Sequence, residues 1–195
     1  RLGNCGVTFA PCRPQDRECL AGMMETVEDI PREAILSGLP WDWDSYGEYL
    51  DSVERLSPMI NVAGLVGHCA TRFYVMGERS VEEPATPDEI RQIADLAGAS
   101  VRDGAFGFST SRASVHKLPD GRCIPGTYAK RDELMAIAAA VGQHGGIMQT
   151  VMNFEDIENE MQLIGDGAGL CRGALFSQVC SPSAEARQRQ DERVM

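Results

Sequence analysis

Short apolar runs alternate with segments of helical period from Asn61 onward, and this alternation limits the fold more than any other feature. Residues 61–68 (NVAGLVGH) are almost continuously apolar, as is typical of a strand covered on both faces. Similar runs follow at 105–111, 147–152 and 174–180, and helical patterns lie between them at 86–104, 130–146 and 155–167. Parallel neighbouring strands need crossovers of about a dozen residues or more, so the alternation predicts βα units and a parallel sheet.

The segment from Thr86 to Gly104 carries the clearest helix signals. Thr86 is a suitable N-cap, Pro87 suits the first helical position, and Gly104 suits the end. One apolar stripe follows the helical period, formed by Ile90, Ile93, Ala94, Ala97 and Val101. We therefore expect a helix packed on the sheet.

An open doubly wound sheet and a closed (β/α)8 barrel both satisfy the alternation. No G-x-G-x-x-G turn joins a strand to a helix, which argues against a dinucleotide site. A complete barrel runs to about 250 residues. The chain has 195 residues and starts at Arg1, just before a turn-like Gly-Asn-Cys-Gly. We expect residues 1–195 to be the central segment of one barrel domain, truncated at both ends.

The charge and the cysteines narrow the class of protein further. Lys and Arg number 18 and Asp and Glu 29, and this net charge of −11 argues against nucleic acid and anionic membranes as partners. The start has no signal peptide, and no apolar run approaches the roughly 20 residues of a membrane span, so we expect a cytoplasmic protein. Seven scattered cysteines, an odd number without any Cys-x2-Cys pair, are typical of reduced thiols.

Residues 28–56 precede the first clear strand. Trp41 and Trp43 lie among turn formers, where they either anchor a long loop against the body of the protein or offer a stacking platform for a substrate. A short helix follows, with its apolar side chains at helical spacing: Tyr46, Tyr49, Leu50 and Val53.

Functional residues of βα proteins gather at the carboxyl ends of the strands. Cys5 lies in a glycine-flanked turn and is either a buried, inert thiol or a zinc ligand or nucleophile. His68 ends an apolar run and Arg72 follows it; the pair suits carboxylate binding or acid–base chemistry, and a histidine held by loop backbone is the alternative.

Weaker candidates follow the second strand. Three hydroxyls and a guanidinium (Ser109, Thr110, Ser111 and Arg112) end that strand, either as functional groups or as loop caps. No Gly-x-Ser-x-Gly elbow accompanies them. We expect structural roles for His116, in a surface loop, and for His144, at a helix end.

Several collinear segments resemble one enzyme family. They are GNCGVTFAP, GLPWDWDSYGEYLD, NVAGLVGHCATRFYVMGE, ATPDEIRQIADL and GAFGFSTSR with the DGRCIPGTYAKRDEL that follows. Over roughly residues 1–150 the chain resembles the N-acyl-D-amino-acid deacylases (D-aminoacylases) of the amidohydrolase superfamily. The resemblance implies a zinc-dependent (β/α)8 barrel that hydrolyses the amide of N-acyl-D-amino acids, with zinc activating water.

The resemblance also assigns roles. It implies that Cys5 is a metal ligand, that a His-x-His lies upstream of Arg1, and that the catalytic aspartate lies downstream of Met195. Candidates for orienting the small-molecule substrate are His68, Arg72 and Tyr128.

Histidines at the ends of strands five and six complete the zinc site in the family. Here the corresponding runs are IMQTVM and LFSQVC, with Gln149 and Gln178, and no histidine follows His144. Glutamine is a poor zinc ligand. Either the strand count is shifted, or the chain belongs to a divergent branch with a reduced metal site, or it is inactive. The alternative function is binding: a catalytically inactive barrel that binds an acylated amino acid or a partner protein.

Overall fold

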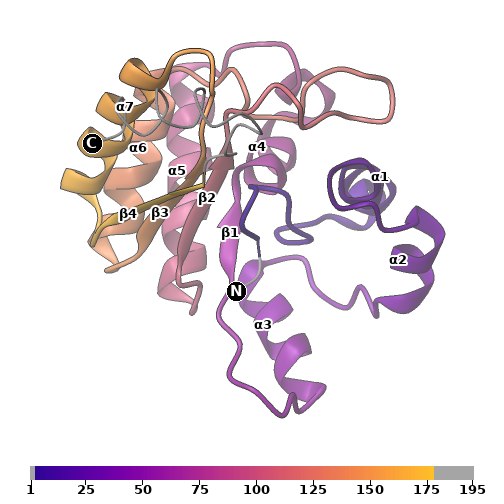
Figure 1. The fold of residues 1–195 in the computed structure, drawn as a ribbon. Coiled ribbons are helices and arrows are strands. Elements are labelled where there is room, and N and C mark those ends of the chain that lie inside the picture. The colour runs from indigo at the N-terminus through magenta and orange to yellow at the C-terminus, as the bar shows by residue number, and fades with distance from the viewer. Residues whose placement is uncertain (1–2, 178–195) are drawn as a thin grey trace, which may run out of the picture.

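A computed structural model describes residues 3–177, in which four parallel strands form one sheet (Figure 1). The strands are β1 (Leu65–Gly67), β2 (Gly107–Ser111), β3 (Ile147–Val151) and β4 (Ala174–Ser177), paired in chain order. Every sequence-predicted strand is therefore present in parallel pairing. The end of the fourth, residues 178–180, lies outside the described residues.

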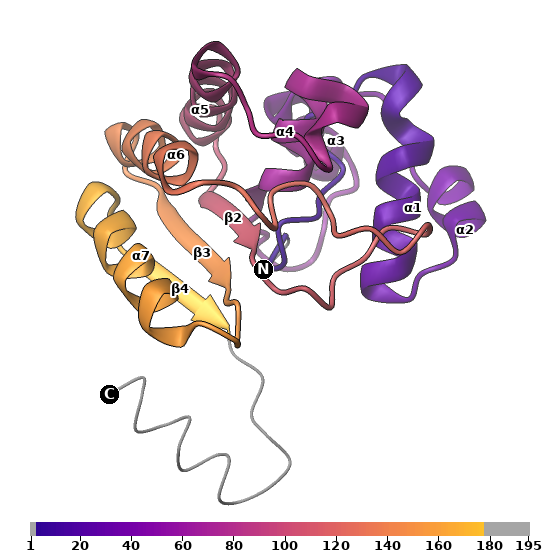
Figure 2. The ribbon, with the colours of Figure 1, turned by 90° about the horizontal axis from the view of Figure 1, so that it is seen from above.

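Three long helices, α5 (Pro87–Arg102), α6 (Arg131–Gln143) and α7 (Ile157–Leu170), connect successive strands. Figure 2 shows them side by side on one face of the sheet, where α6 packs between α5 and α7. A doubly wound sheet reverses its strand order and carries helices on both faces. Strands in unbroken order with these helices on one face are an arc of a barrel, which confirms the partial α/β barrel.

The start of α5 follows from local chemistry. The Thr86 side chain accepts a hydrogen bond from the Glu89 amide, and the Glu89 carboxylate accepts one from the Thr86 amide. This capping box, with Pro87 in the first turn, satisfies amides that a helix start leaves free. The expected stripe is buried except at its first residue, Ile90, which is half-buried.

Three helices were not predicted: α1 (Arg17–Glu28), α2 (Arg32–Gly38) and α4 (His68–Met76). Helix α4 starts directly after β1 and is buried on most of its surface, so its sequence has no amphipathic period. Single turns of 3-10 helix lie at Pro14–Asp16 and Gly77–Ser80.

The predicted helix after the tryptophans is α3 (Tyr46–Arg55), which starts with a Ser45–Glu48 capping box. Trp41 and Trp43 are buried, and their ring centroids lie 5.5 Å apart. The Trp43 indole N–H donates to the Phe9 carbonyl at 2.7 Å. The two side chains therefore anchor the loop, as the packing alternative predicts.

The two faces of the sheet differ in chemistry. Met148 of β3 packs on the helix side against Leu134 and Leu163. Side chains alternate along a strand, so Gln149 and its register partner Ser109 point to the opposite face. This opposite face corresponds to the interior of a complete barrel.

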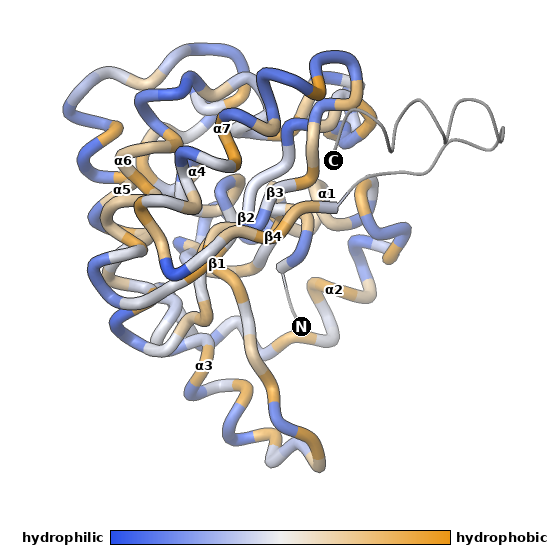
Figure 3. The backbone as a smooth tube through the Cα atoms, turned by 60° about the vertical axis from the view of Figure 1, so that its left-hand side comes forward, coloured by the Kyte–Doolittle hydropathy of each residue, from blue (hydrophilic) through white to orange (hydrophobic). Residues whose placement is uncertain are grey.

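The loop between α3 and β1 is strongly apolar yet exposed. Leu56, Met59 and Ile60 lie largely in solvent there, and Figure 3 shows the hydrophobic stretch beyond α3, at the amino-terminal end of the strands. No helix of the described residues is long and apolar enough to cross a membrane. The six cysteines of the described part are free thiols, as predicted.

Candidate functional site

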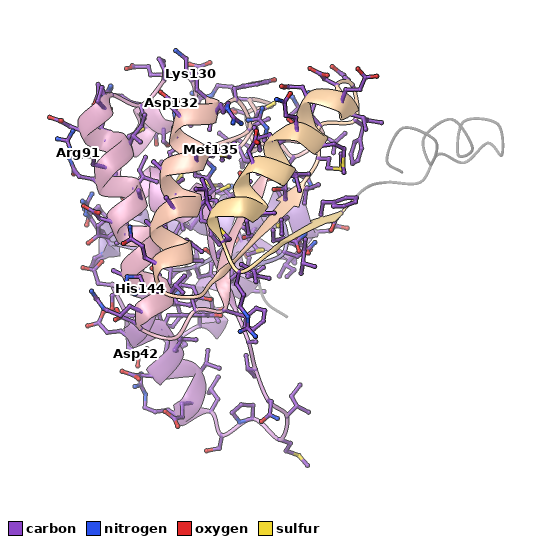
Figure 4. The ribbon with its side chains drawn as sticks, turned by 90° about the vertical axis from the view of Figure 1, so that its left-hand side faces the viewer. Asp42, Arg91, Lys130, Asp132, Met135 and His144 are labelled. Carbon is purple, nitrogen blue, oxygen red and sulfur yellow. The ribbon has the colours of Figure 1, made fainter. Side chains whose placement is uncertain are left out.

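The carboxyl end of the sheet gathers the polar side chains in two groups. One is a buried ionic network that begins at His68, directly after β1, and lies toward the helices. The other lies around Cys5 and the end of β2. His144 belongs to neither, because Figure 4 shows it at the opposite end of α6 from Lys130 and Asp132.

The buried ionic network consists of His68, Arg72 and Glu133, which are 0%, 4% and 2% exposed. His68 Nε2 lies 2.8 Å from a Glu133 carboxylate oxygen, and the same carboxylate accepts hydrogen bonds from Arg72 Nη1. His68 Nδ1 lies 2.9 Å from the Thr110 hydroxyl. An ionised glutamate only accepts, so a neutral His68 carries its proton on Nε2 and accepts from Thr110.

Charges in this network are balanced. Burial raises the pKa of Glu133, but hydrogen bonds and charge from His68 and Arg72 outweigh it and bring the pKa to about 2. Burial lowers the pKa of His68, against the opposing effect of Glu133. Arg72 also donates from Nε to the Ser80 carbonyl at 2.9 Å. The network is therefore a buried Arg72–Glu133 ion pair whose carboxylate also bonds the imidazole of His68.

A cavity of about 210 Å³ adjoins the network. Its lining includes Arg72, Glu133 and the Tyr128 ring, with Lys130 and Asp132 from the start of α6. The Tyr128 side chain is 73% exposed. The structure thus brings two predicted substrate-orienting residues, Arg72 and Tyr128, to one cavity, while His68 does not line it. Their roles toward a substrate stay predictions.

Cys5 has a carboxylate partner that the sequence did not indicate. Its thiol donates to Glu28, at the end of α1, over 3.2 Å. Burial raises the pKa of Cys5 to about 12, and the charge of Glu28 adds to the effect. In the absence of a cation the sulfur is therefore a protonated thiol.

Gly6 places Cys5 beside the end of β2. A Cβ on Gly6, whose φ is +83°, would lie 3.0 Å from Thr110 Cα and 3.1 Å from the Ser111 amide, so only glycine fits this approach without strain. Ser111 Oγ lies 2.7 Å from His116 Nδ1. Burial lowers the pKa of His116, and the charge of Glu28 opposes that shift.

Cys5, Glu28, Ser111 and His116 are called the strand-end cluster below. His116 was expected in a surface loop with a structural role, but it is half-buried and bonded to the end of β2. Sequence reasoning missed Glu28 entirely, because 22 residues separate it from Cys5 and α1 was not recognised.

The strand-end cluster does not fit a complete zinc site by itself. Catalytic zinc uses three protein ligands and one open position. Within residues 3–177, no three His, Cys, Asp or Glu side chains are placed to hold one ion together. Cys5 and Glu28 offer two donors. Gln149 donates to the Ser177 hydroxyl at 3.2 Å, and Gln178 lies outside the described residues. The ligand role of Cys5 stays a prediction.

Ser109 lies within β2 and Arg112 follows it, and neither belongs to the strand-end cluster. Arg112 pairs with Glu160 at 2.9 Å and donates to the Ala129 carbonyl at 2.7 Å. Ser109 Oγ is buried on the barrel-interior face without a hydrogen-bond partner among the described residues. The guanidinium therefore ties the end of β2 to α7.

Consecutive parallel strands, helices on one face and polar side chains at the carboxyl ends define the chain as an arc of a TIM-barrel protein. In fold it is similar to a D-aminoacylase variant crystallised with copper chloride (TM-score 0.69, 24% identity), covering 97% of this chain and 36% of that one. An N-acyl-D-glutamate deacylase from Bordetella bronchiseptica, bound to zinc and a phosphonate inhibitor, is similar at a TM-score of 0.67 and 23% identity, covering 98% and 38%.

Curated relatives agree with the fold comparison. The D-aminoacylase of Alcaligenes xylosoxydans xylosoxydans is 27% identical over 153 residues, which are 78% of this chain and 27% of that protein. The N-acyl-D-glutamate deacylase of the same organism is 30% identical over 146 residues, 75% and 25% respectively. An uncharacterised protein of Mycobacterium tuberculosis is 28% identical over 173 residues, 84% and 27%. No family model matches the chain.

The chain spans about a quarter of the length of these curated relatives. Its named relatives and structural neighbours are D-aminoacylases and N-acyl-D-glutamate deacylases of the amidohydrolase superfamily. The resemblance that the sequence indicates is therefore confirmed.

Proposed function

We propose that the protein is a metal-dependent hydrolase that cleaves the amide bond of N-acyl-D-amino acids. The observation that carries the proposal is the similarity to two enzymes of this activity over three quarters of the chain. Residues 1–195 would be the central part of a single barrel domain. We expect a cytoplasmic enzyme with a small-molecule substrate and no nucleic-acid or membrane partner.

Zinc is the proposed cofactor, and Cys5 is its proposed ligand. One structural neighbour holds zinc and another was crystallised with copper chloride, which supports a divalent metal. Cys5 and Glu28 could supply two donors, so further ligands would have to come from outside the described residues.

Arg72 and Tyr128 are proposed to orient the substrate at the 210 Å³ cavity. Tyr128 brings an exposed phenol, which suits an amide oxygen, and a substrate carboxylate would share the Arg72 guanidinium with Glu133. His68 would act through Glu133, as a positioning residue that holds the carboxylate against Arg72.

Hydrolysis by the full-length protein tests the proposal. N-acetyl-D-glutamate and N-acetyl-D-methionine are offered beside their L enantiomers, and the released amine is measured. We expect release from the D compounds at a rate well above that from the L compounds. No release from the D compounds, or equal release from both enantiomers, would contradict the assigned activity.

A non-catalytic binding protein is the second candidate function. The observation that favours it is the two-donor set at Cys5, which is smaller than a catalytic zinc site needs. Calorimetric binding of N-acetyl-D-glutamate without any hydrolysis would support this candidate, and turnover of the same compound would exclude it.

A further inference from the structure

The loop after β2 continues from His116 of the strand-end cluster into a short hairpin. Lys117 and Cys123 pair across it as an antiparallel bridge, and the Leu118 amide donates to the Arg122 carbonyl at 2.8 Å. Figure 2 shows this loop reaching over toward α1. The backbone pairing therefore holds the Lys117 and Cys123 side chains side by side.

Three polar groups surround the Cys123 sulfur: the Lys117 ammonium, the Tyr128 hydroxyl, and the Ser114 carbonyl, which accepts from the thiol at 3.8 Å. Lys117 Nζ donates to it at 3.1 Å, and Tyr128 Oη lies 3.2 Å away. The Lys117 ammonium therefore lies where it can stabilise the negative charge that builds up on the sulfur when the sulfur reacts. The contact with Cys123 also raises the pKa of Lys117. Cys123 itself is 7% exposed, whereas the Tyr128 side chain that contacts it is largely in solvent.

The other thiols lie in different surroundings. Cys5 faces the Glu28 carboxylate, and Cys171, like Cys123, donates to a backbone carbonyl, but among the described thiols a lysine contact is seen at Cys123 alone. Burial raises the pKa of Cys19 and of Cys171 to about 11. Thiolate character governs the reaction of cysteine with peroxides, so the six free thiols should differ widely in reactivity.

We propose that Cys123 and Lys117 form a hydroperoxide-reactive site in which the cysteine is oxidised and then bonded to the lysine nitrogen. In the first step the sulfur attacks the terminal oxygen of the hydroperoxide. The O–O bond breaks, an alcohol or water leaves, and the sulfur becomes a sulfenic acid. In the second step the lysine amine attacks this sulfur, an S–N bond forms, and the sulfenic oxygen leaves as water. Together one thiol, one amine and one hydroperoxide give one sulfenamide, one alcohol and one water.

The structure favours the second step in two ways. The nitrogen and sulfur already lie in contact, and the bridge of the hairpin keeps them there. A sulfenic acid is neutral, so after oxidation the sulfur offers the lysine ammonium no opposite charge, and the amine can lose its proton to become the nucleophile. Sulfenic acids are known to condense with nearby nitrogen in this way.

Peptide-resolved mass spectrometry after brief treatment with hydrogen peroxide tests the proposal on the intact protein. We expect Cys123 to be oxidised about tenfold faster than Cys19. The product should be a species joined between Lys117 and Cys123 that lacks two hydrogen atoms and is reversed by dithiothreitol. Equal oxidation of the two cysteines, or oxidised Cys123 without the joined species, would overturn the proposal.

Two substitutions separate the chemistry from a purely structural role. Lys117→Arg keeps a cation but supplies no nucleophilic amine, so Cys123 should still oxidise fast and form no joined species. Lys117→Met removes the cation, so iodoacetamide should alkylate Cys123 about tenfold more slowly near neutral pH. Lys130→Met, at the other lysine of the chain, is the matched control and should change neither result. An unchanged alkylation rate in Lys117→Met would overturn the assigned role of the lysine.

Discussion

Glu133 illustrates what single residues contribute to this structure. Its carboxylate is almost completely removed from water and lies between Arg72 and the imidazole of His68. A buried ion pair adds little compared with apolar residues of the same shape, but loss of one partner leaves the other charge buried and unpaired. The network should therefore be sensitive to substitution even if it never touches a substrate.

Glu133→Gln should lower the free energy of unfolding by about 3 kcal/mol, because it leaves the Arg72 guanidinium without its counter-charge. Urea unfolding followed by circular dichroism measures the loss. Asp88→Asn, which removes the partner of the exposed Arg91, is the control and should cost below about 1 kcal/mol. Equal effects of the two substitutions would show that the buried network is energetically like a surface pair.

The same carboxylate predicts how stability depends on pH. The pKa of Glu133 falls from an ordinary value of 4.5 to about 2 on folding, so the folded state binds fewer protons. Its stabilising contribution is present above pH 4.5 and is lost as the pH falls toward about 2. Unfolding measured across this window should show a steeper loss in the wild type than in Glu133→Gln, and parallel curves would contradict the assignment.

The sequence indicated some of these residues and not others. Cys5 was recognisable because it lies in a glycine-flanked turn. His68 and Arg72 were recognisable because they follow an apolar strand. Their carboxylate partners were not, because Glu133 looks like an ordinary polar residue at the start of an amphipathic helix and lies 65 residues from His68. Local pattern carries no signal for a pair that only the tertiary fold brings together.

At the scale of helices and strands, periodicity predicted most elements from Asn61 onward. All four strands and the helices α5, α6 and α7 lie within a few residues of the predicted ranges. Helices α1, α2 and α4 were missed for physical reasons. Helix α4 lacks a polar face, and α2 is only 7 residues long. The buried residues of α1 form one run, Leu20 to Met23, rather than a long stripe.

The contact between α6 and α7 supplies a prediction at this scale. A Cβ on Gly142 of α6 would lie 1.8 Å from the Leu170 carbonyl oxygen at the end of α7, so Gly142→Ala must push the two helices apart. We expect a loss of about 1–3 kcal/mol in the free energy of unfolding.

Gly165 provides the matched control for that substitution. It also lies inside a helix, but an added Cβ would meet nothing within 4 Å. Gly165→Ala should stabilise the protein by about 0.5–1 kcal/mol through helix propensity. If Gly142→Ala unfolds at the same free energy as the wild type, Gly142 and the Leu170 carbonyl are not as close as described, and the prediction is wrong.

At the scale of the whole molecule, residues 3–177 form an open arc of four strands in which β4 is an edge strand. Within residues 3–177 no strand pairs with the outer edge of β4, where Leu175 is 44% and Phe176 39% exposed. Unpaired strand edges with apolar side chains promote association between chains. We therefore expect the edge of β4 to be a site of association between chains.

The isolated 195-residue chain should therefore self-associate at micromolar concentration, as measured by light scattering after size-exclusion chromatography. Leu175→Lys should reduce the association, because a lysine on an edge strand opposes pairing with another chain. Arg91→Lys, on the exposed surface of α5, should not. A monomeric wild type with a cooperative thermal transition would contradict the prediction.

Zinc content measured beside deacylase activity tests most directly whether Cys5 belongs to the centre of a metal-dependent enzyme. The full-length wild type, Cys5→Ala and Cys12→Ala are compared. Cys12 is also a buried thiol, but its sulfur donates to the Arg13 carbonyl, and among residues 3–177 no carboxylate is seen within hydrogen-bond distance of it. We expect zinc and D-amino-acid release in the wild type and in Cys12→Ala, and loss of both in Cys5→Ala. Zinc content that Cys5→Ala leaves unchanged would contradict the account.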